Sequence, residues 1–125
     1  MSKRVLIVDD EEDIREVARV SLEVAGGWEV LTAGSGQEAL CIAQVEQPDA
    51  ILLDVTMPDM DGVATYQKLV ADTDTRSIPV ILLTAKLQIA DRRRFADLGV
   101  KAVIAKPFDP LGLPAQLKTA LGWAD

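Results

Sequence analysis

The chain has 125 residues, of which 49% are hydrophobic and 26% are charged. This is the composition of one ordinary globular domain, which at this length can build a core without disulfides or a structural metal. Thirteen basic and twenty acidic residues give a net charge of −7 at pH 7. This negative charge argues against direct binding to nucleic acids, which attract clustered positive charge.

The inventory of reactive side chains is short. Cys41 is the only cysteine, and histidine is absent. An intramolecular disulfide, a zinc site of Cys and His and a histidine-based catalytic triad are therefore excluded. A bound metal would need oxygen ligands, which Mg²⁺, Mn²⁺ and Ca²⁺ prefer. The apolar run at 5–8 is too short for a signal peptide or a membrane span, so we expect a cytoplasmic protein without membrane contact.

Continuous apolar runs of strand length alternate along the chain with segments of helical spacing. The runs lie at residues 5–8, 30–33, 50–53, 79–83 and 102–105. A helix is expected after each run. The first helix ends at residues 26–27, and the other four span about 35–47, 63–71, 89–98 and 110–121. Strands without polar alternation are covered on both sides, so this order predicts an α/β fold with a doubly wound five-stranded parallel sheet.

Helical spacing assigns several residues to packing. On the first helix these are Ile14, Val17, Ala18, Leu22 and Ala25. Cys41 is expected in the core on the second helix, and Trp28 and Trp123 are expected to pack near the ends of elements. Pro114 must lie in the first turn of the last helix, or that helix begins later than residue 110.

Polar side chains follow four of the apolar runs, where each run ends. They are Asp9 and Asp10 after the first run, Asp54 after the third, Thr84 after the fourth and Lys106 after the fifth. The carboxyl ends of parallel strands meet at one edge of the sheet, where ligands bind in doubly wound folds. Clustered carboxylates repel one another, and a hard divalent ion such as Mg²⁺ would relieve this. An acidic first helical turn would explain part of the run, but neither Asp54 nor Lys106.

Four segments in this order resemble the receiver domain of two-component response regulators. They are VLIVDD at 5–10, ILLDVTMPDMDG at 51–62, VILLTA at 80–85 and KPF at 106–108. The resemblance covers essentially the whole chain, so residues 1–125 are expected to form one receiver domain. It implies a flavodoxin-like fold with the strand order 2-1-3-4-5 and helices on both faces.

By this resemblance, Asp54 accepts a phosphoryl group from a sensor histidine kinase or a phosphotransfer protein. Thr84 and Lys106 contact the phosphoryl group, and the Lys106–Pro107 peptide bond is cis. The chain would transfer the group to itself and lose it again by itself, and it would not be an enzyme with a separate substrate. An acyl phosphate of this kind is labile, which suits a timed signal.

The resemblance also implies the metal site. Mg²⁺, or Mn²⁺ in its place, would be bound by Asp10, Asp54 and the backbone carbonyl of Thr56, while Asp9 would support the ion through water. By the same resemblance, Thr56 and Lys86 occupy positions that tune how fast water removes the phosphoryl group.

The expected signalling surface departs from the family at one position. The resemblance implies that a downstream protein docks on the face formed by residues 89–98, 102–105 and 110–121. Three residues before the Lys-Pro pair, where many receivers carry Tyr or Phe, this chain has Val103. We therefore expect activation to depend on the phosphoryl contacts, with position 103 passive. The basic cluster at 92–94 is either a solvated helix face or a partner contact.

The sequence also allows three alternative interpretations of its function. A Mg²⁺-dependent aspartyl-phosphate phosphatase of the haloacid dehalogenase type carries its acids in one Asp-x-Asp motif, whereas Asp9 and Asp10 are adjacent and Asp54 stands apart. A degenerate receiver would act as an unphosphorylated binding module, against which the complete set of acids argues. Residues 34–39 formally match a dinucleotide-binding fingerprint, but a simple turn and helix entry is favoured.

Overall fold

One five-stranded parallel sheet forms the centre of the computed structural model, which describes residues 3–57, 60–85 and 89–123. Its strand order is β2-β1-β3-β4-β5, which confirms the predicted sheet and its strand order. The strands are β1 (Arg4–Val8), β2 (Glu29–Ala33), β3 (Ala50–Asp54), β4 (Val80–Thr84) and β5 (Ala102–Ala105). All four pairings between neighbouring strands are parallel.

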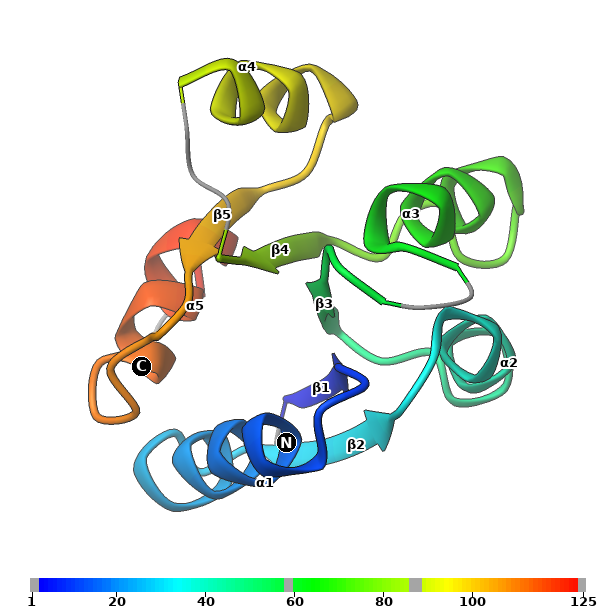
Figure 1. Ribbon diagram of the computed structural model, residues 1–125. Helices are drawn as coiled ribbons and strands as arrows, with labels where there is room; N and C mark the ends of the chain where they lie inside the picture. The colour runs from blue at the N-terminus through cyan, green and yellow to red at the C-terminus, as the bar shows by residue number, and fades with distance from the viewer. Residues whose placement is uncertain (1–2, 58–59, 86–88, 124–125) are drawn as a thin grey trace.

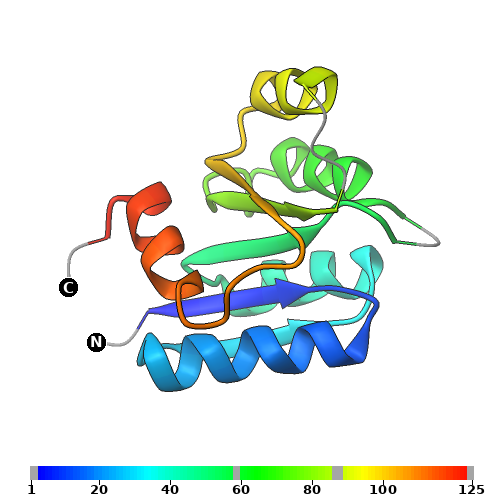
Figure 2. The same cartoon turned by 60° about the vertical axis from the view of Figure 1, so that its left-hand side comes forward.

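Helices cover both faces of this sheet (Figure 1). They are α1 (Glu12–Val20) with the π-helical turn η1 (Ser21–Ala25), α2 (Gly36–Glu46), α3 (Gly62–Ala71), α4 (Ile89–Leu98) and α5 (Leu113–Leu121). The helices α1 and α5 lie on one face, and α2 and α3 lie on the other (Figures 1 and 2). Among the described residues, none of the helices combines the length and apolar character needed to span a bilayer.

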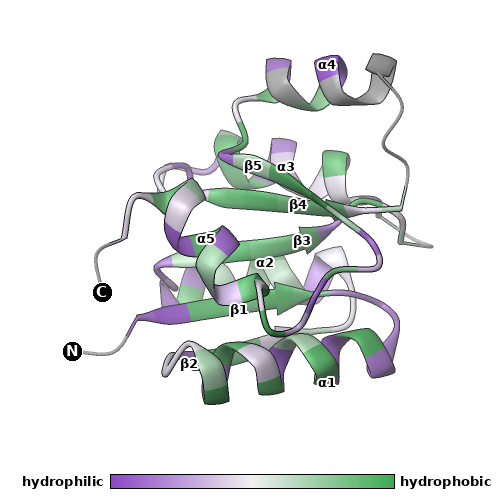
Figure 3. Ribbon diagram, turned by 90° about the vertical axis from the view of Figure 1, so that its left-hand side faces the viewer, coloured by the Kyte–Doolittle hydropathy of each residue, from purple (hydrophilic) through white to green (hydrophobic). Residues whose placement is uncertain are grey.

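The sheet separates two hydrophobic cores, and alternate residues of each strand point into one or the other. In β1, Leu6 and Val8 pack with residues of α2 and α3, whereas Val5 and Ile7 pack with residues of α1 and α5. The strands are accordingly hydrophobic over most of their length, with charged residues at some of their ends (Figure 3). This double burial explains why the strand sequences lack polar alternation.

Side chains and turn residues set where several helices begin. Ser35 Oγ accepts a hydrogen bond from the backbone of Glu38 at 3.2 Å, and an Asp61 carboxylate oxygen accepts one from Ala64 at 2.8 Å, so α2 and α3 have capped starts. The last helix begins at Leu113, later than residue 110, because 109–112 form a turn first. Pro114 therefore lies in the first turn, where its missing N–H costs nothing.

Three residues assigned to packing are exposed. Val17 is 45% exposed, and Ala25 is exposed at the end of η1. The first helix is buried through Ala18 and Leu22, and the wider π-helical turn takes Ala25 out of line with them. Cys41 is also exposed, because α2 buries Ala39 and Ala43 and position 41 lies on its other side.

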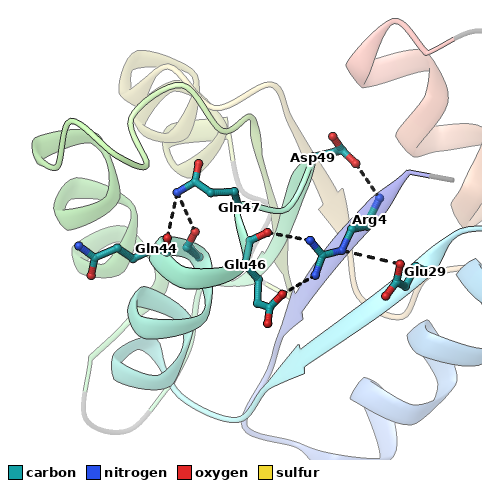
Figure 4. Close-up of polar contacts among 7 residues, drawn as sticks. Arg4, Glu29, Gln44, Glu46, Gln47 and Asp49 are labelled. Carbon is teal, nitrogen blue, oxygen red and sulfur yellow. Dashed lines mark hydrogen bonds and ion pairs between the residues drawn. The ribbon is translucent and has the colours of Figure 1, made fainter. Parts of the chain in front are cut away.

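The edge of the sheet where the strands begin is held by polar and aromatic contacts. The Arg4 guanidinium donates to the Glu46 carbonyl at 2.8 Å and pairs with the Glu46 carboxylate at 2.6 Å, while its backbone N–H donates to Asp49 (Figure 4). Trp28 and Trp123 form an edge-to-face pair with ring centroids 5.2 Å apart, which confirms their packing role. These contacts join β1 to the end of α2, and the start of β2 to the end of α5.

We expect Leu117→Ala to destabilise the fold strongly, because Leu117 on α5 is completely buried. The loss should be about 2–5 kcal/mol in the free energy of unfolding, measured by urea denaturation. Leu111→Ala is the matched control, since Leu111 precedes the same helix and is 85% exposed. The control should change stability by less than about 0.5 kcal/mol, and equal losses for the two variants would contradict this packing of α5.

Candidate functional site

Three carboxylates meet where the neighbouring strands β1 and β3 end. Asp9 and Asp10 directly follow β1, and Asp54 is the last residue of β3. The strand order β2-β1-β3 places β1 and β3 side by side and reverses direction there. Doubly wound folds bind their ligands beside such a reversal. One oxygen from each of the three carboxylates lies within 4.8 Å of the others. Asp9 and Asp54 are buried, whereas Asp10 is exposed.

Lys106 brings a positive charge into this cluster from the end of β5. Its Nζ lies 2.9 Å from Asp9 Oδ2 and 3.1 Å from Asp54 Oδ1, and its side chain is only 12% exposed. A single ammonium cannot balance three carboxylates, so the cluster keeps a net negative charge when all three are ionised. The sequence-based expectation that strand ends gather these four residues is confirmed.

The cluster is suited to a divalent cation. Within the described part of the chain, Asp54 Oδ2 is buried and has no hydrogen-bond partner, which leaves a buried anionic oxygen unsatisfied. The donors in the cluster are carboxylate oxygens, which are the ligands that Mg²⁺ and Mn²⁺ prefer. The acidic cluster of Asp9, Asp10 and Asp54 therefore fits a hard divalent ion.

Burial and charge shift the protonation of two groups here. Burial is the largest cause that raises the pKa of Asp54, and the Asp9 charge adds to it. Contacts with Lys106 oppose the rise, and the resulting value is about 6. Burial acts to lower the pKa of Lys106, but its hydrogen bonds and charge pairs with Asp9 and Asp54 outweigh this and raise it. Lys106 therefore stays charged at neutral pH.

Backbone N–H groups orient both buried carboxylates. Asp9 Oδ1 accepts a hydrogen bond from Glu11 N at 2.9 Å, and Asp54 Oδ1 accepts one from Thr56 N at 3.3 Å. Each aspartate thus closes a short turn in the loop that follows its strand. Thr56 lies in the loop after Asp54, as the sequence predicts, with its residue exposed to solvent.

Thr84 lies buried at the end of β4, next to the strand that leads to Lys106. Its carbonyl accepts a hydrogen bond from Lys106 N at 2.9 Å, so the two predicted phosphoryl contacts are joined through the backbone. The Lys106–Pro107 bond is cis, as the resemblance implies. Val103 is half-buried and packs against the core on the α2 and α3 side of the sheet.

Some predicted features lie outside what the structure describes. Lys86 is not among the described residues, and neither is the side chain of Arg92. Arg93 and Arg94 are exposed on α4, which is compatible with a solvated face and with a partner contact alike.

Two further residues contact the site in roles that the sequence did not predict, although Gly62 ends the 51–62 motif. Arg15 Nη1 donates to the carbonyl of Asp9 at 2.7 Å, a contact to the backbone that no residue type marks in the sequence. Gly62 N donates to Val55 O at 2.8 Å, and a Cβ at this position would collide with the Asp54 carbonyl. Gly62 is therefore required where α3 starts against the end of β3.

The raised pKa of Asp54 predicts a specific pH dependence of stability in the metal-free protein. The folded state binds a proton between the ordinary value of 3.8 and about 6, so ionising Asp54 costs stability as the pH rises through this window. With EDTA at pH 7, Asp54→Asn should unfold with a free energy about 2–3 kcal/mol higher than wild type. Urea titrations at several pH values should show this advantage shrinking toward pH 4.5, and a constant difference would contradict the assignment.

The comparisons with known proteins agree with the geometry. The family model of the response regulator receiver domain matches residues 5–118. The protein titled "Probable transcriptional regulator ycf27" of Cyanophora paradoxa is 42% identical over 95% of this chain and 48% of its own length. The phosphate regulon transcriptional regulatory protein PhoB of Pseudomonas aeruginosa is 40% identical, over 97% of this chain and 52% of that protein. The chain thus spans about half the length of the curated relatives it matches.

Solved structures match over nearly their full length. The chemotaxis protein CheY4 of Vibrio cholerae has a TM-score of 0.88 and 31% identity, covering 96% of this chain and 99% of that one. A CheY-like receiver domain protein of Methanospirillum hungatei has a TM-score of 0.86 and 29% identity, over 98% of this chain and 95% of that one. With the strand order and the strand-end carboxylates described above, these matches show that the chain belongs to the response regulator receiver domain family.

Proposed function

We propose that the protein is a phosphoacceptor switch in which Asp54 takes a phosphoryl group from a phosphohistidine. The observation that carries this proposal is the buried Asp54 carboxylate at the end of β3, paired with Lys106 and within 4.8 Å of Asp9 and Asp10 oxygens. Asp10, Asp54 and the carbonyl of Thr56 would bind Mg²⁺ or Mn²⁺, with Asp9 supporting the ion through water. The bound ion would supply positive charge to the phosphoryl oxygens.

Phosphoryl transfer needs positioning and charge neutralisation more than covalent help. In the proposed step, an Asp54 carboxylate oxygen forms a bond to phosphorus while the bond between phosphorus and the donor's histidine nitrogen breaks. The Lys106 ammonium, which pairs with Asp54, would neutralise one phosphoryl oxygen, and the hydroxyl of Thr84 at the end of β4 would donate to another. Water later attacks the acyl phosphate and releases inorganic phosphate.

Because the phosphoryl group ends on the chain itself, the protein would act as a switch and not as an enzyme with a separate substrate. We propose that its donor is a sensor histidine kinase or a phosphotransfer protein, and that a downstream protein docks on the face of α4, β5 and α5. The net charge of −7 argues against nucleic acid as a direct ligand of this chain. We further propose that residues 1–125 act as one receiver domain in the cytoplasm.

The switch would work without an aromatic residue at position 103. Moving a two-state equilibrium from mostly inactive to mostly active takes about 5.5 kcal/mol of differential interaction. Hydrogen bonds from Thr84 and Lys106 to a charged phosphoryl group could supply about 1.5–3 kcal/mol each. Val103 has too little surface to add comparably by moving inward. We therefore assign the coupling to Thr84 and Lys106.

The first test of the proposed function is phosphorylation by acetyl phosphate with Mg²⁺, followed by intact mass. Wild type should gain one phosphoryl group, and Asp54→Asn should gain none because the nucleophile is lost. Addition of EDTA should prevent the gain, because the uncompensated carboxylates repel a phosphate dianion. Asp49→Asn is the control, since Asp49 lies at the opposite edge of the sheet beside Arg4 and should be labelled like wild type. Full labelling of Asp54→Asn, or labelling in EDTA, would refute the proposal.

The second test separates phosphorylation from switching. Thr84→Ala should still be phosphorylated on Asp54 but should lose the change in hydrogen exchange that phosphorylation causes in β5 and α5 of wild type, because the hydroxyl contact is absent. Val103→Ala should keep that change to within about threefold in exchange rate, since its side chain contributes little apolar burial. The reverse pattern, with coupling lost in Val103→Ala and kept in Thr84→Ala, would contradict the assignment.

A further inference from the structure

One side chain beside the acidic cluster has no part in the proposed phosphoryl chemistry. Arg15 lies on α1, half-buried, and its Nη1 donates to the carbonyl oxygen of Asp9 at 2.7 Å. This differs from Arg19, one turn further along the helix, whose guanidinium pairs with the exposed carboxylates of Glu16 and Glu23. The Arg15 guanidinium instead donates its hydrogen bond to the backbone carbonyl of Asp9, a buried residue of the site.

The Asp9 carbonyl belongs to the peptide unit that joins Asp9 to Asp10. The preceding peptide unit is also fixed, because Asp9 N donates to the Ala33 carbonyl of β2 at 3.1 Å. With both units held, the direction in which the chain leaves β1 is set, and so is the position from which the Asp10 carboxylate extends. Asp10 is exposed and would otherwise be the least restrained of the three acids.

A glycine in the neighbouring loop leaves room for the guanidinium. A Cβ at Gly34, just after β2, would lie 3.1 Å from Arg15 Nη1, which is closer than a comfortable van der Waals contact. Gly34 does not have a positive φ, so conformational freedom does not require glycine there. The close approach of Arg15 is the contact that a side chain at this position would disturb.

We propose that Arg15 is a positioning residue for the divalent metal site. It acts through the Asp9 carbonyl, holding the peptide unit between Asp9 and Asp10 so that the Asp10 carboxylate stays beside Asp54. This inference rests on the proposed function, because it assumes that the acidic cluster binds Mg²⁺. It assigns Arg15 no contact with the metal or with the phosphoryl group.

The sign of the effect on Mg²⁺ affinity separates positioning from electrostatics. Arg15 is a cation near a cation site, so by Coulomb's law alone its removal should tighten Mg²⁺ binding. If the guanidinium positions the acids, its removal should weaken binding despite the lost repulsion. Partners outside the ligand sphere that orient metal ligands change affinity by tenfold or more when they are removed.

The test is calorimetric titration of MgCl₂ into the full chain. Arg15→Met keeps the side-chain length but loses the donor, and it should bind Mg²⁺ about tenfold more weakly. Arg15→Lys keeps a charged donor and should recover most of the affinity. Arg19→Met is the matched control, with the same change on the same helix, and should bind like wild type or slightly more tightly.

A second variant keeps the proposal falsifiable if Arg15→Met folds poorly. Gly34→Ala should displace the mobile end of Arg15 without altering any metal ligand, and it should weaken Mg²⁺ binding in the same direction. In the Arg15→Met background, Gly34→Ala should have no further effect on affinity, since the group it displaces is gone. Urea denaturation in EDTA establishes that each variant is folded.

The outcomes are distinct. Unchanged or tighter Mg²⁺ binding by folded Arg15→Met, or a loss of stability in EDTA without a loss of affinity, would overturn the role of Arg15 alone. Failure of wild type to bind Mg²⁺ would overturn the proposed function and this inference with it. Weakening in Arg15→Met with recovery in Arg15→Lys would establish the positioning role.

Discussion

The repulsion between the buried carboxylates of Asp9 and Asp54 is the constraint around which this fold is arranged. Two adjacent parallel strands bring these groups together, because β1 and β3 pair in a register that ends both at the same edge. Lys106 reaches both from the end of β5, and backbone N–H groups hold each carboxylate in its turn. Even so, burial and the Asp9 charge raise the pKa of Asp54 to about 6. Binding of a divalent cation would relieve this repulsion and stabilise the fold.

The two edges of the sheet, where the strands begin and where they end, differ in how well their polar groups are paired. At the edge where strands begin, the Arg4 guanidinium pairs with Glu46 and Glu29, its backbone N–H donates to Asp49, and the tryptophan pair packs at the same edge. These exposed ion pairs are worth little individually, but they join segments distant in sequence. At the opposite edge, buried acids are left short of partners. The described polar groups are thus better paired at the edge where strands begin than at the acidic cluster.

The sheet and the position of the site could be predicted from the sequence, because both depend on a simple repeating pattern of apolar runs followed by polar residues. The five apolar runs predict buried parallel strands, and the polar residues that follow four of these runs fall at the site edge through the topology alone. The roles of Asp54, Thr84 and Lys106 in phosphoryl transfer stay predictions. Helix faces were predicted less well, since spacing alone placed Val17, Ala25 and Cys41 in the core. The π-helical turn exposes Ala25, and the small buried face of α2 leaves Cys41 outside; neither feature is visible in the sequence pattern. Val17 is exposed on α1, where the adjacent Ala18 is the buried residue.

Arg15 escaped sequence analysis for a related reason. Its partner is a backbone carbonyl, and every residue carries one, so no residue type marks the contact. Gly34 likewise reads as part of an ordinary turn until the guanidinium beside it is seen. The contact of Arg15 depends on a main-chain oxygen and on the missing side chain of Gly34. Interactions of this kind become visible only in the three-dimensional structure.

The tryptophan pair decides what can be learned from the protein's own fluorescence. Trp28 and Trp123 are the only tryptophans, and they contact each other where β2 begins and α5 ends. Lys3 lies 5.1 Å from the Trp123 ring centroid, so the emitting rings sense the first and last segments of the chain together. Their emission therefore reports the docking of the chain ends and global unfolding. The acidic cluster lies at the opposite edge of the sheet, so events there call for a readout other than this emission.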